Sequence, residues 1–189
     1  MRTFIAIDLP KELKEKIFTY ARRLAGGINI KLVEKENLHL TLLFLGEMAE
    51  EEKERVMKVL GPPAGGLGGL GKINLRLGKA EIFPDKKRPR GIWINVEGEK
   101  EKLFSLYKKI IDRLLKEGVK LEDRNLRFSP HITVGRIKEK AKKVGVLRSG
   151  SCWIGELGGE FMAGRVTLYQ SQLGAKGPKY TKLGEFEVK

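Results

Sequence analysis

The sequence has few of the residues on which several classes of protein depend. It contains one cysteine, Cys152, two histidines in 189 residues, and only 7% aromatic residues. A single cysteine cannot form an internal disulfide or a cysteine-rich zinc site, which is typical of a cytoplasmic protein. No apolar run approaches the roughly 20 residues of a membrane-spanning helix, and the apolar stretch within residues 1–7 is too short and too early for a signal peptide. We therefore expect a cytoplasmic protein with a mostly aliphatic core and no membrane partner.

Negative charge is scarce as well. The chain has 38 Lys and Arg against 24 Asp and Glu, which gives a net charge of +14. Thermophilic proteins have surfaces rich in Lys, Arg and Glu, and such a surface would explain the 33% charged residues. It would not explain the excess of positive over negative charge. An excess of positive charge attracts polyanions over long range, so it favours nucleic acid or another phosphate-rich partner.

The predicted secondary structure repeats once along the chain. A strand, a helix and two strands are expected at 4–8, 10–24, 28–33 and 38–45, and again at 92–96, 99–116, 119–121 and 126–134. Further helices are expected at 50–60 and 138–146, and further strands at 73–83, 161–173 and 180–188. The duplication predicts one α+β domain over residues 1–189, with two pseudo-symmetric lobes at about 1–85 and 90–189 that are free to exchange terminal strands. We expect two mainly antiparallel sheets that face each other across a central groove, with helices on the outer faces.

The two histidines begin the same motif. Residues 39–42 read His-Leu-Thr-Leu and residues 131–134 read His-Ile-Thr-Val, and each motif falls at the same point of its repeat. Successive side chains of a strand point to opposite faces, so each strand would bury its aliphatic residues and present histidine and threonine on the other face. Two such strands in facing lobes would place two imidazoles and two hydroxyls around one small group.

Two imidazoles suit the hydrolysis of a phosphodiester. With a reference pKa of about 6.5, one of His39 and His131 can accept a proton from water while the other donates one to the leaving oxygen. The hydroxyls of Thr41 and Thr133 can donate hydrogen bonds to the non-bridging phosphate oxygens. Purely structural histidines and a metal site are the alternatives. The matched copies argue against the first, and two histidines with one distant cysteine are too few ligands for zinc, so we expect no metal and no cofactor.

These ordered motifs resemble the two-histidine phosphoesterase superfamily, and more closely the RNA 2′,3′-cyclic phosphodiesterases, also called 2′-5′ RNA ligases. The resemblance covers nearly the whole chain, and it rests on residues 4–7, 37–46, 82–84, 131–136 and 171–180. It implies that both motifs line one cleft, that His39 is the acid and that His131 activates water. Spacing alone leaves the two roles interchangeable.

The resemblance also indicates residues around the motifs. Arg136 corresponds to an arginine that contacts substrate phosphate, a role that suits its guanidinium, although a solvated arginine at a strand end is the alternative. Gly135 departs from the family pattern, because we expect a larger or a different small residue there. Two aromatic residues, Phe44 and Tyr180, could stack on an RNA base, although core packing is the alternative for Phe44. A basic loop could also contact RNA, with a solvated hairpin tip as the alternative; its residues are Lys86, Lys87, Arg88 and Arg90.

The sequence therefore predicts a monomeric, metal-independent phosphodiesterase that acts on RNA ends with a 2′,3′-cyclic phosphate, such as tRNA fragments, and leaves a 2′-phosphate. The reverse reaction would join RNA ends through a 2′-5′ bond in the same site. Two alternatives remain open: a phosphodiesterase for another small cyclic phosphate, and an RNA-binding protein without turnover. The intact motifs argue against the second, because binding alone needs no matched imidazoles.

Overall fold

The computed structural model describes residues 1–25, 29–61, 67–84, 89–121, 128–138, 157–174 and 177–188. Its helices are α1 (Lys11–Ala25), the short 3₁₀ helix η1 (Lys35–Asn37), α2 (Glu50–Leu60) and α3 (Lys100–Lys116). Its strands are β1 (Arg2–Asp8), β2 (Ile30–Leu32), β3 (His39–Glu47), β4 (Ile73–Phe83), β5 (Gly91–Gly98), β6 (His131–Ile137), β7 (Glu160–Ala163), β8 (Arg165–Gly174) and β9 (Gly177–Glu187).

Most of the predicted elements are confirmed, and the differences have local causes. The strand expected at 161–173 is two strands, because the chain turns at Gly164 from one end of the sheet to the other. The strand expected at 126–134 begins only at His131, and residues 119–121 form no strand. Most of the short helix expected at 138–146 lies outside the described residues.

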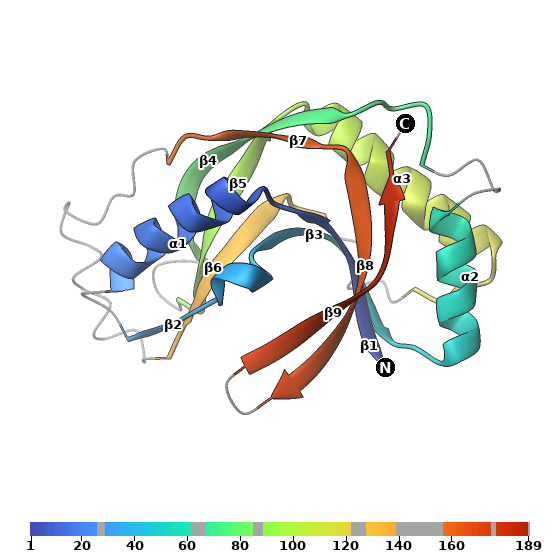
Figure 1. Ribbon diagram of the computed structural model, residues 1–189, viewed down its shortest axis with the longest axis horizontal. Helices are drawn as coiled ribbons and strands as arrows, with labels where there is room; N and C mark the ends of the chain where they lie inside the picture. The colour runs from blue at the N-terminus through green and yellow to red at the C-terminus, as the bar shows by residue number, and fades with distance from the viewer. Residues whose placement is uncertain are drawn as a thin grey trace.

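The strands form one curled, mainly antiparallel sheet in the order β7-β4-β5-β6-β3-β1-β8-β9, with β2 paired to β6 (Figure 1). The α+β class is therefore confirmed, with both halves of the sheet joined by hydrogen bonds between β3 and β6. Each half takes strands from both repeats, since β4 lies beside β5 whereas β8 and β9 lie beside β1. The last strands of each repeat thus lie in the half of the sheet that holds the other repeat, whereas the division into lobes at about 1–85 and 90–189, with terminal strands free to exchange, stays a prediction.

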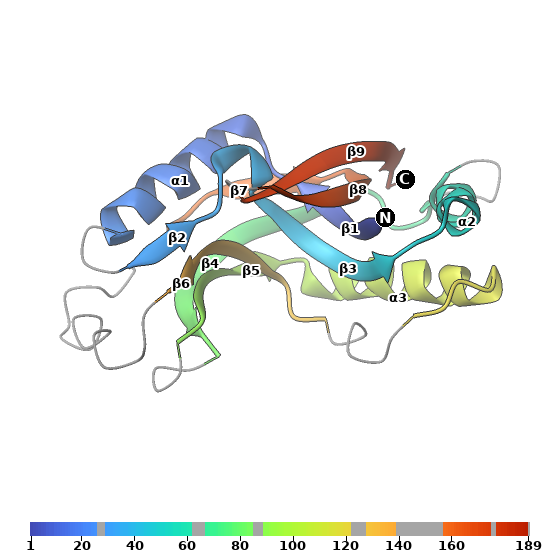
Figure 2. The ribbon, with the colours of Figure 1, turned by 90° about the horizontal axis from the view of Figure 1, so that it is seen from below.

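The helices pack on one face of the sheet because their apolar residues recur at helical spacing. Leu13, Ile17 and Ala21 of α1 are buried, as are Leu103 and Ile110 of α3, and all five belong to one continuous core. Helix α1 contacts β2 and β6, whereas α3 contacts β4 and α2 (Figures 1 and 2). The histidines lie on the opposite face of the sheet. Within the described residues, no helix is both long and apolar enough to span a membrane.

Candidate active site

The two histidines occupy the first positions of β3 and β6. In both strands the aliphatic residues of the motif are buried in the core, whereas the histidine and the threonine are half-buried on the opposite face. The alternation expected from the sequence is therefore present in both motifs. The aliphatic residues concerned are Leu40, Leu42, Ile132 and Val134.

The two motifs are brought together through their middle residues. Leu40 and Ile132 are Cα partners in the antiparallel pair of β3 and β6. Continued by one residue in each direction, this register sets His39 opposite Thr133 and Thr41 opposite His131. The histidines are then diagonal neighbours, which lie about 7–8 Å apart in an antiparallel ladder. The motif strands had been expected in separate facing sheets; they are instead adjacent in one sheet.

Both imidazoles are held in the same way by the backbone two residues earlier. His39 Nδ1 lies 2.7 Å from the carbonyl oxygen of Asn37, and His131 Nδ1 lies 2.7 Å from that of Ser129. A carbonyl oxygen only accepts hydrogen bonds, so each ring carries its hydrogen on Nδ1 and keeps the Nε2 lone pair available. His39 Nε2 lies 2.9 Å from Oγ1 of Thr41, whose hydroxyl can donate to it.

Aromatic rings fix the planes of both imidazoles. Phe4 stacks on His39 with ring centroids 4.9 Å apart, and Tyr180 meets the same ring edge-on at 5.4 Å. On the other side Trp93 stacks on His131 at 3.8 Å and on Phe83 at 3.7 Å. The sequence reasoning missed Trp93, although a signal was present: it alternates with buried Ile92 and Ile94 and so belongs to the face of the sheet that carries the histidines.

These surroundings lower the pKa of both histidines. Burial lowers the pKa of His39 to about 4, although its hydrogen bond to Asn37 acts in the opposite direction. Burial also lowers the pKa of His131, against its hydrogen bond to Ser129. The nearby charges differ, because Asp8 is the cross-strand partner of His39 on β1 whereas neutral Asn95 is that of His131 on β5. Both rings therefore stay neutral to a lower pH than free imidazole. At His39 the Lys14 ammonium lowers the pKa more than the Asp8 carboxylate raises it.

Matching β-bulges follow the two motifs. The pairing of β1 with β3 shifts by one residue after Thr41, and the pairing of β5 with β6 shifts by one residue after Thr133. An extra residue in one strand returns the following side chains to the other face. Phe44 and Arg136, each five places after its histidine, thereby share the face of the histidines. They are equivalent positions of the duplicated unit.

A cavity of about 190 Å³ opens beside the motifs between β2, β3, β6 and the start of β9. Six of the residues expected at the site line it, namely His39, Thr41, Phe44, Thr133, Arg136 and Tyr180. Phe44 is 56% exposed and so does not belong to the core. Arg90 is exposed just before β5 and is not among the lining residues, and Lys86, Lys87 and Arg88 lie outside the described residues.

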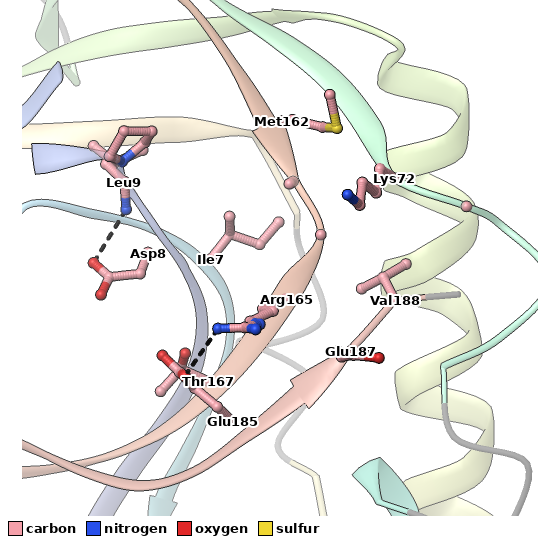
Figure 3. Close-up of a pocket in the computed structure, with 14 residues that line it drawn as sticks. Ile7, Asp8, Leu9, Lys72, Met162, Arg165, Thr167, Glu185, Glu187 and Val188 are labelled. Atoms are coloured by element: carbon pink, nitrogen blue, oxygen red, sulfur yellow. Dashed lines mark hydrogen bonds and ion pairs between the residues drawn. The ribbon is translucent and has the colours of Figure 1, made fainter. Parts of the chain in front are cut away.

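A second cavity of about 620 Å³ lies at the C-terminal end of β1, where β7 turns into β8 (Figure 3). Asp8 and Glu187 line it together with Lys72 and with Arg165, which lies 3.8 Å from Glu185 (Figure 3). Charges of both signs alternate there, and neither histidine reaches it. His39 lines the smaller cavity, and His131 is not among its lining residues. Among the described residues, no cluster of three or more His, Cys, Asp or Glu could hold a metal ion.

Comparisons with known proteins agree with this geometry. Residues 6–161 match the model of the AKAP7 2′5′ RNA ligase-like domain. The chain is 36% identical to the RNA 2′,3′-cyclic phosphodiesterase of Archaeoglobus fulgidus, and the match covers 99% of this chain and 100% of that protein. It is 33% identical to the RNA 2′,3′-cyclic phosphodiesterase of Methanocaldococcus jannaschii, and the match covers 98% of this chain and 100% of that protein. The crystal structure of E. coli LigT complexed with 3′-AMP superposes with a TM-score of 0.78 at 25% identity, and it covers 99% of this chain and 97% of that one.

Proposed function

The chain belongs to the 2′5′ RNA ligase-like family, which includes the RNA 2′,3′-cyclic phosphodiesterases, and on this premise we propose that it hydrolyses a terminal 2′,3′-cyclic phosphate of RNA to a 2′-phosphate. In this reaction water adds to phosphorus, the bond from phosphorus to the 3′ oxygen breaks, and the 2′ oxygen keeps the phosphate. One group must take a proton from the water and another must give one to the 3′ oxygen.

One observation carries this proposal: two imidazoles with the same Nδ1–H tautomer lie as diagonal neighbours on one face of the sheet. Water attacks opposite the leaving oxygen, so the acid and the base must reach opposite sides of one phosphorus. Two diagonal imidazoles, with the Thr41 hydroxyl 2.9 Å from Nε2 of His39, match this demand. A protein that only binds RNA has no need of two rings prepared in this way.

We assign His39 as the acid and His131 as the base. The resemblance implies this division. The charges around His39 do not supply it, because the Lys14 ammonium opposes a proton on His39 more than the Asp8 carboxylate favours one. The negative charge of the bound phosphodiester would raise the pKa of His39 and supply the proton when it is needed. Thr41 and Thr133 donate to the non-bridging oxygens, and Arg136 neutralises phosphate charge at the edge of the cavity.

The partner that fits the cavity is an RNA end. A lining of Phe44, Tyr180 and Pro178 offers apolar surface to a terminal base, and Arg136 lies beside it. One chain supplies both histidines, so we also propose that the protein acts as a monomer; its single cysteine accords with action in the cytoplasm. The same site could join RNA ends through a 2′-5′ bond if a 2′,3′-cyclic end and a free 5′ hydroxyl are bound together.

The test is the product of an oligoribonucleotide with a 2′,3′-cyclic phosphate end. We expect a product heavier by one water whose terminal phosphate is on the 2′ oxygen, as identified by ³¹P NMR. His39→Ala and His131→Ala should each lose roughly 100-fold or more in kcat and keep affinity for RNA. An unchanged cyclic end, or turnover that survives both substitutions, would refute the proposal. Selective turnover of a small cyclic phosphate that is not part of RNA would favour the other phosphodiesterase function.

A further inference from the structure

Two positive side chains face each other at the edge of the smaller cavity. Lys31 of β2 and Arg136 of β6 are Cα partners in an antiparallel pair, so their side chains leave the sheet on the same face. Both are exposed, and both line the cavity that holds His39 and Thr133.

Gly135 makes this juxtaposition possible. A Cβ on Gly135 would lie 2.7 Å from Cδ1 of Ile30 and 3.1 Å from the carbonyl oxygen of Lys31. A larger residue would therefore require the Ile30 side chain or β2 to move. The corresponding residue of the first motif is buried Leu43, which is paired with Ile5 of β1. The small size of Gly135 thus lets β2 lie close to β6 and brings Lys31 beside Arg136.

The pair is unfavourable in the free protein. Like charges directly opposite each other in a sheet are destabilising, and within the described part of the chain neither Lys31 nor Arg136 forms an ion pair with a carboxylate. Glu34 also lines the cavity and is likewise unpaired there. The Lys31 ammonium points across to the β8–β9 turn, since a Cβ built on Gly177 would lie 3.6 Å from its Nζ. An anion between the two cations would remove the repulsion.

We propose that Lys31, beside Arg136, binds the internucleotide phosphate that precedes the terminal cyclic phosphate. This inference rests on the proposed function, in which Thr41 and Thr133 hold the terminal phosphate. Arg136 lies three residues beyond Thr133, or roughly 10 Å along a strand, and Lys31 is on the next strand. One cavity extends from His39 and Thr133 to Lys31, and we place the preceding nucleotide along it. The subsite lets the protein distinguish the end of an RNA chain from a cyclic mononucleotide.

The experiment compares kcat/KM for a dinucleotide and a mononucleotide that both end in a 2′,3′-cyclic phosphate. Lys31→Ala should lower the ratio of dinucleotide to mononucleotide kcat/KM by roughly tenfold, the size of a lost charge-assisted contact, and Lys31→Arg should retain most of it. Lys108→Ala, on α3 away from the cavity, makes the same change in net charge and should leave the ratio unaltered. When the phosphate linkage of the dinucleotide is replaced by a neutral methylphosphonate, the ratio of dinucleotide to mononucleotide kcat/KM for the unmodified protein should fall to that of Lys31→Ala.

The outcomes separate this inference from the proposed function. Hydrolysis of the mononucleotide by the unmodified protein tests the function alone, and its absence together with inactivity on the dinucleotide would refute both. A Lys31→Ala ratio equal to that of the unmodified protein would overturn the subsite while the function stands. The methylphosphonate dinucleotide has no charge for Lys31 to contact. The subsite would therefore also be overturned if Lys31→Ala lowered activity on this dinucleotide relative to the unmodified protein.

Discussion

Trp93 lies flat against His131, with ring centroids 3.8 Å apart and an interplanar angle of 15°. The other face of the indole is covered by Phe83 at 3.7 Å, so the three rings form one stack. Together with the hydrogen bond from Nδ1 to Ser129, this stack leaves the His131 ring little freedom to tilt. We infer that Trp93 positions the base without contacting the substrate.

Trp93→Ala should lower kcat by roughly tenfold or more and change KM little, because a ring that can tilt spends less time in the reactive orientation. It should also raise the pKa of His131 toward 6.5, since water would replace the indole that helps to bury the imidazole. NMR titration can follow this directly, as the chain has only two histidines. Trp93→Phe keeps a flat aromatic face and should retain most of kcat and the lowered pKa. A purely structural role would leave the pKa of His131 unchanged in a folded Trp93→Ala protein.

The sequence predicts the arrangement of the two His-x-Thr motifs because the information for it is local. Alternation within residues 39–42 and 131–134 determines which side chains share a face, and the duplication indicates that both motifs have equivalent places. Trp93 could have been found by the same alternation. The adjacency of Leu40 and Ile132 could not, because it depends on where two strands far apart in sequence meet.

Other features depend on contacts that leave no local pattern. Gly135 reads only as an unexpected glycine until Ile30 is seen against it, and Lys31 reads as one of many surface lysines until β2 is paired with β6. The break at Gly164 has no local signal in the sequence either, because residues 160–163 and 165–174 both form strands. The two strands differ in their positions in the sheet, which the sequence does not show.

The pH dependence should reflect two imidazoles whose pKa values are lowered. In the free protein one imidazole must be protonated and the other neutral, so kcat/KM should fall below the lower of the two pKa values and above the higher one, and follow a bell. Because burial lowers the pKa of His39 to about 4 and also lowers that of His131, the bell should be centred on the acid side of pH 6.5. The bound phosphodiester raises both values, so the profile of kcat should lie at higher pH. A kcat/KM profile centred above pH 6.5 would contradict this.

The division between acid and base can be tested with the leaving group. An aryl phosphodiester such as bis(p-nitrophenyl) phosphate releases an oxygen that needs little protonation, so only the base remains essential. His39→Ala should therefore recover a large part of its deficit on this substrate relative to the cyclic phosphate, whereas His131→Ala should stay impaired on both. Parallel assays of kcat/KM measure the difference. Recovery in His131→Ala instead would exchange the two roles.

Removal of metal ions should not affect turnover. The proposed steps use imidazole, hydroxyl and guanidinium groups, and the described residues contain no group of three or more metal-ligating side chains. We expect equal kcat values before and after dialysis against EDTA, with no increase on addition of zinc, manganese or magnesium. Activity that disappears with EDTA and returns with one of these ions would replace the acid–base mechanism by a metal-assisted one.

Gly135→Ala is the sharpest test of how the cavity is built. The added methyl group would lie 2.7 Å from Cδ1 and 2.8 Å from Cγ1 of Ile30, so either β2 or the Ile30 side chain must move. Overpacking of this kind costs typically 1–3 kcal/mol, and it should appear as a lower free energy of unfolding in denaturant titration. The displaced β2 should also carry Lys31 away from Arg136 and reduce the preference for the dinucleotide, while His131 at the other end of β6 keeps its place.

A second substitution separates the clash from other effects of the alanine. Ile30→Ala removes both side-chain atoms that the new methyl group would meet, so the double variant should bring β2 back and regain the dinucleotide preference lost in Gly135→Ala. Its stability need not return fully, because Ile30 also packs against the core and the Lys31 carbonyl oxygen remains 3.1 Å from the new methyl group. Full stability and an unchanged dinucleotide preference in Gly135→Ala alone would show that β2 tolerates a side chain there. Gly135 would then have no part in placing Lys31.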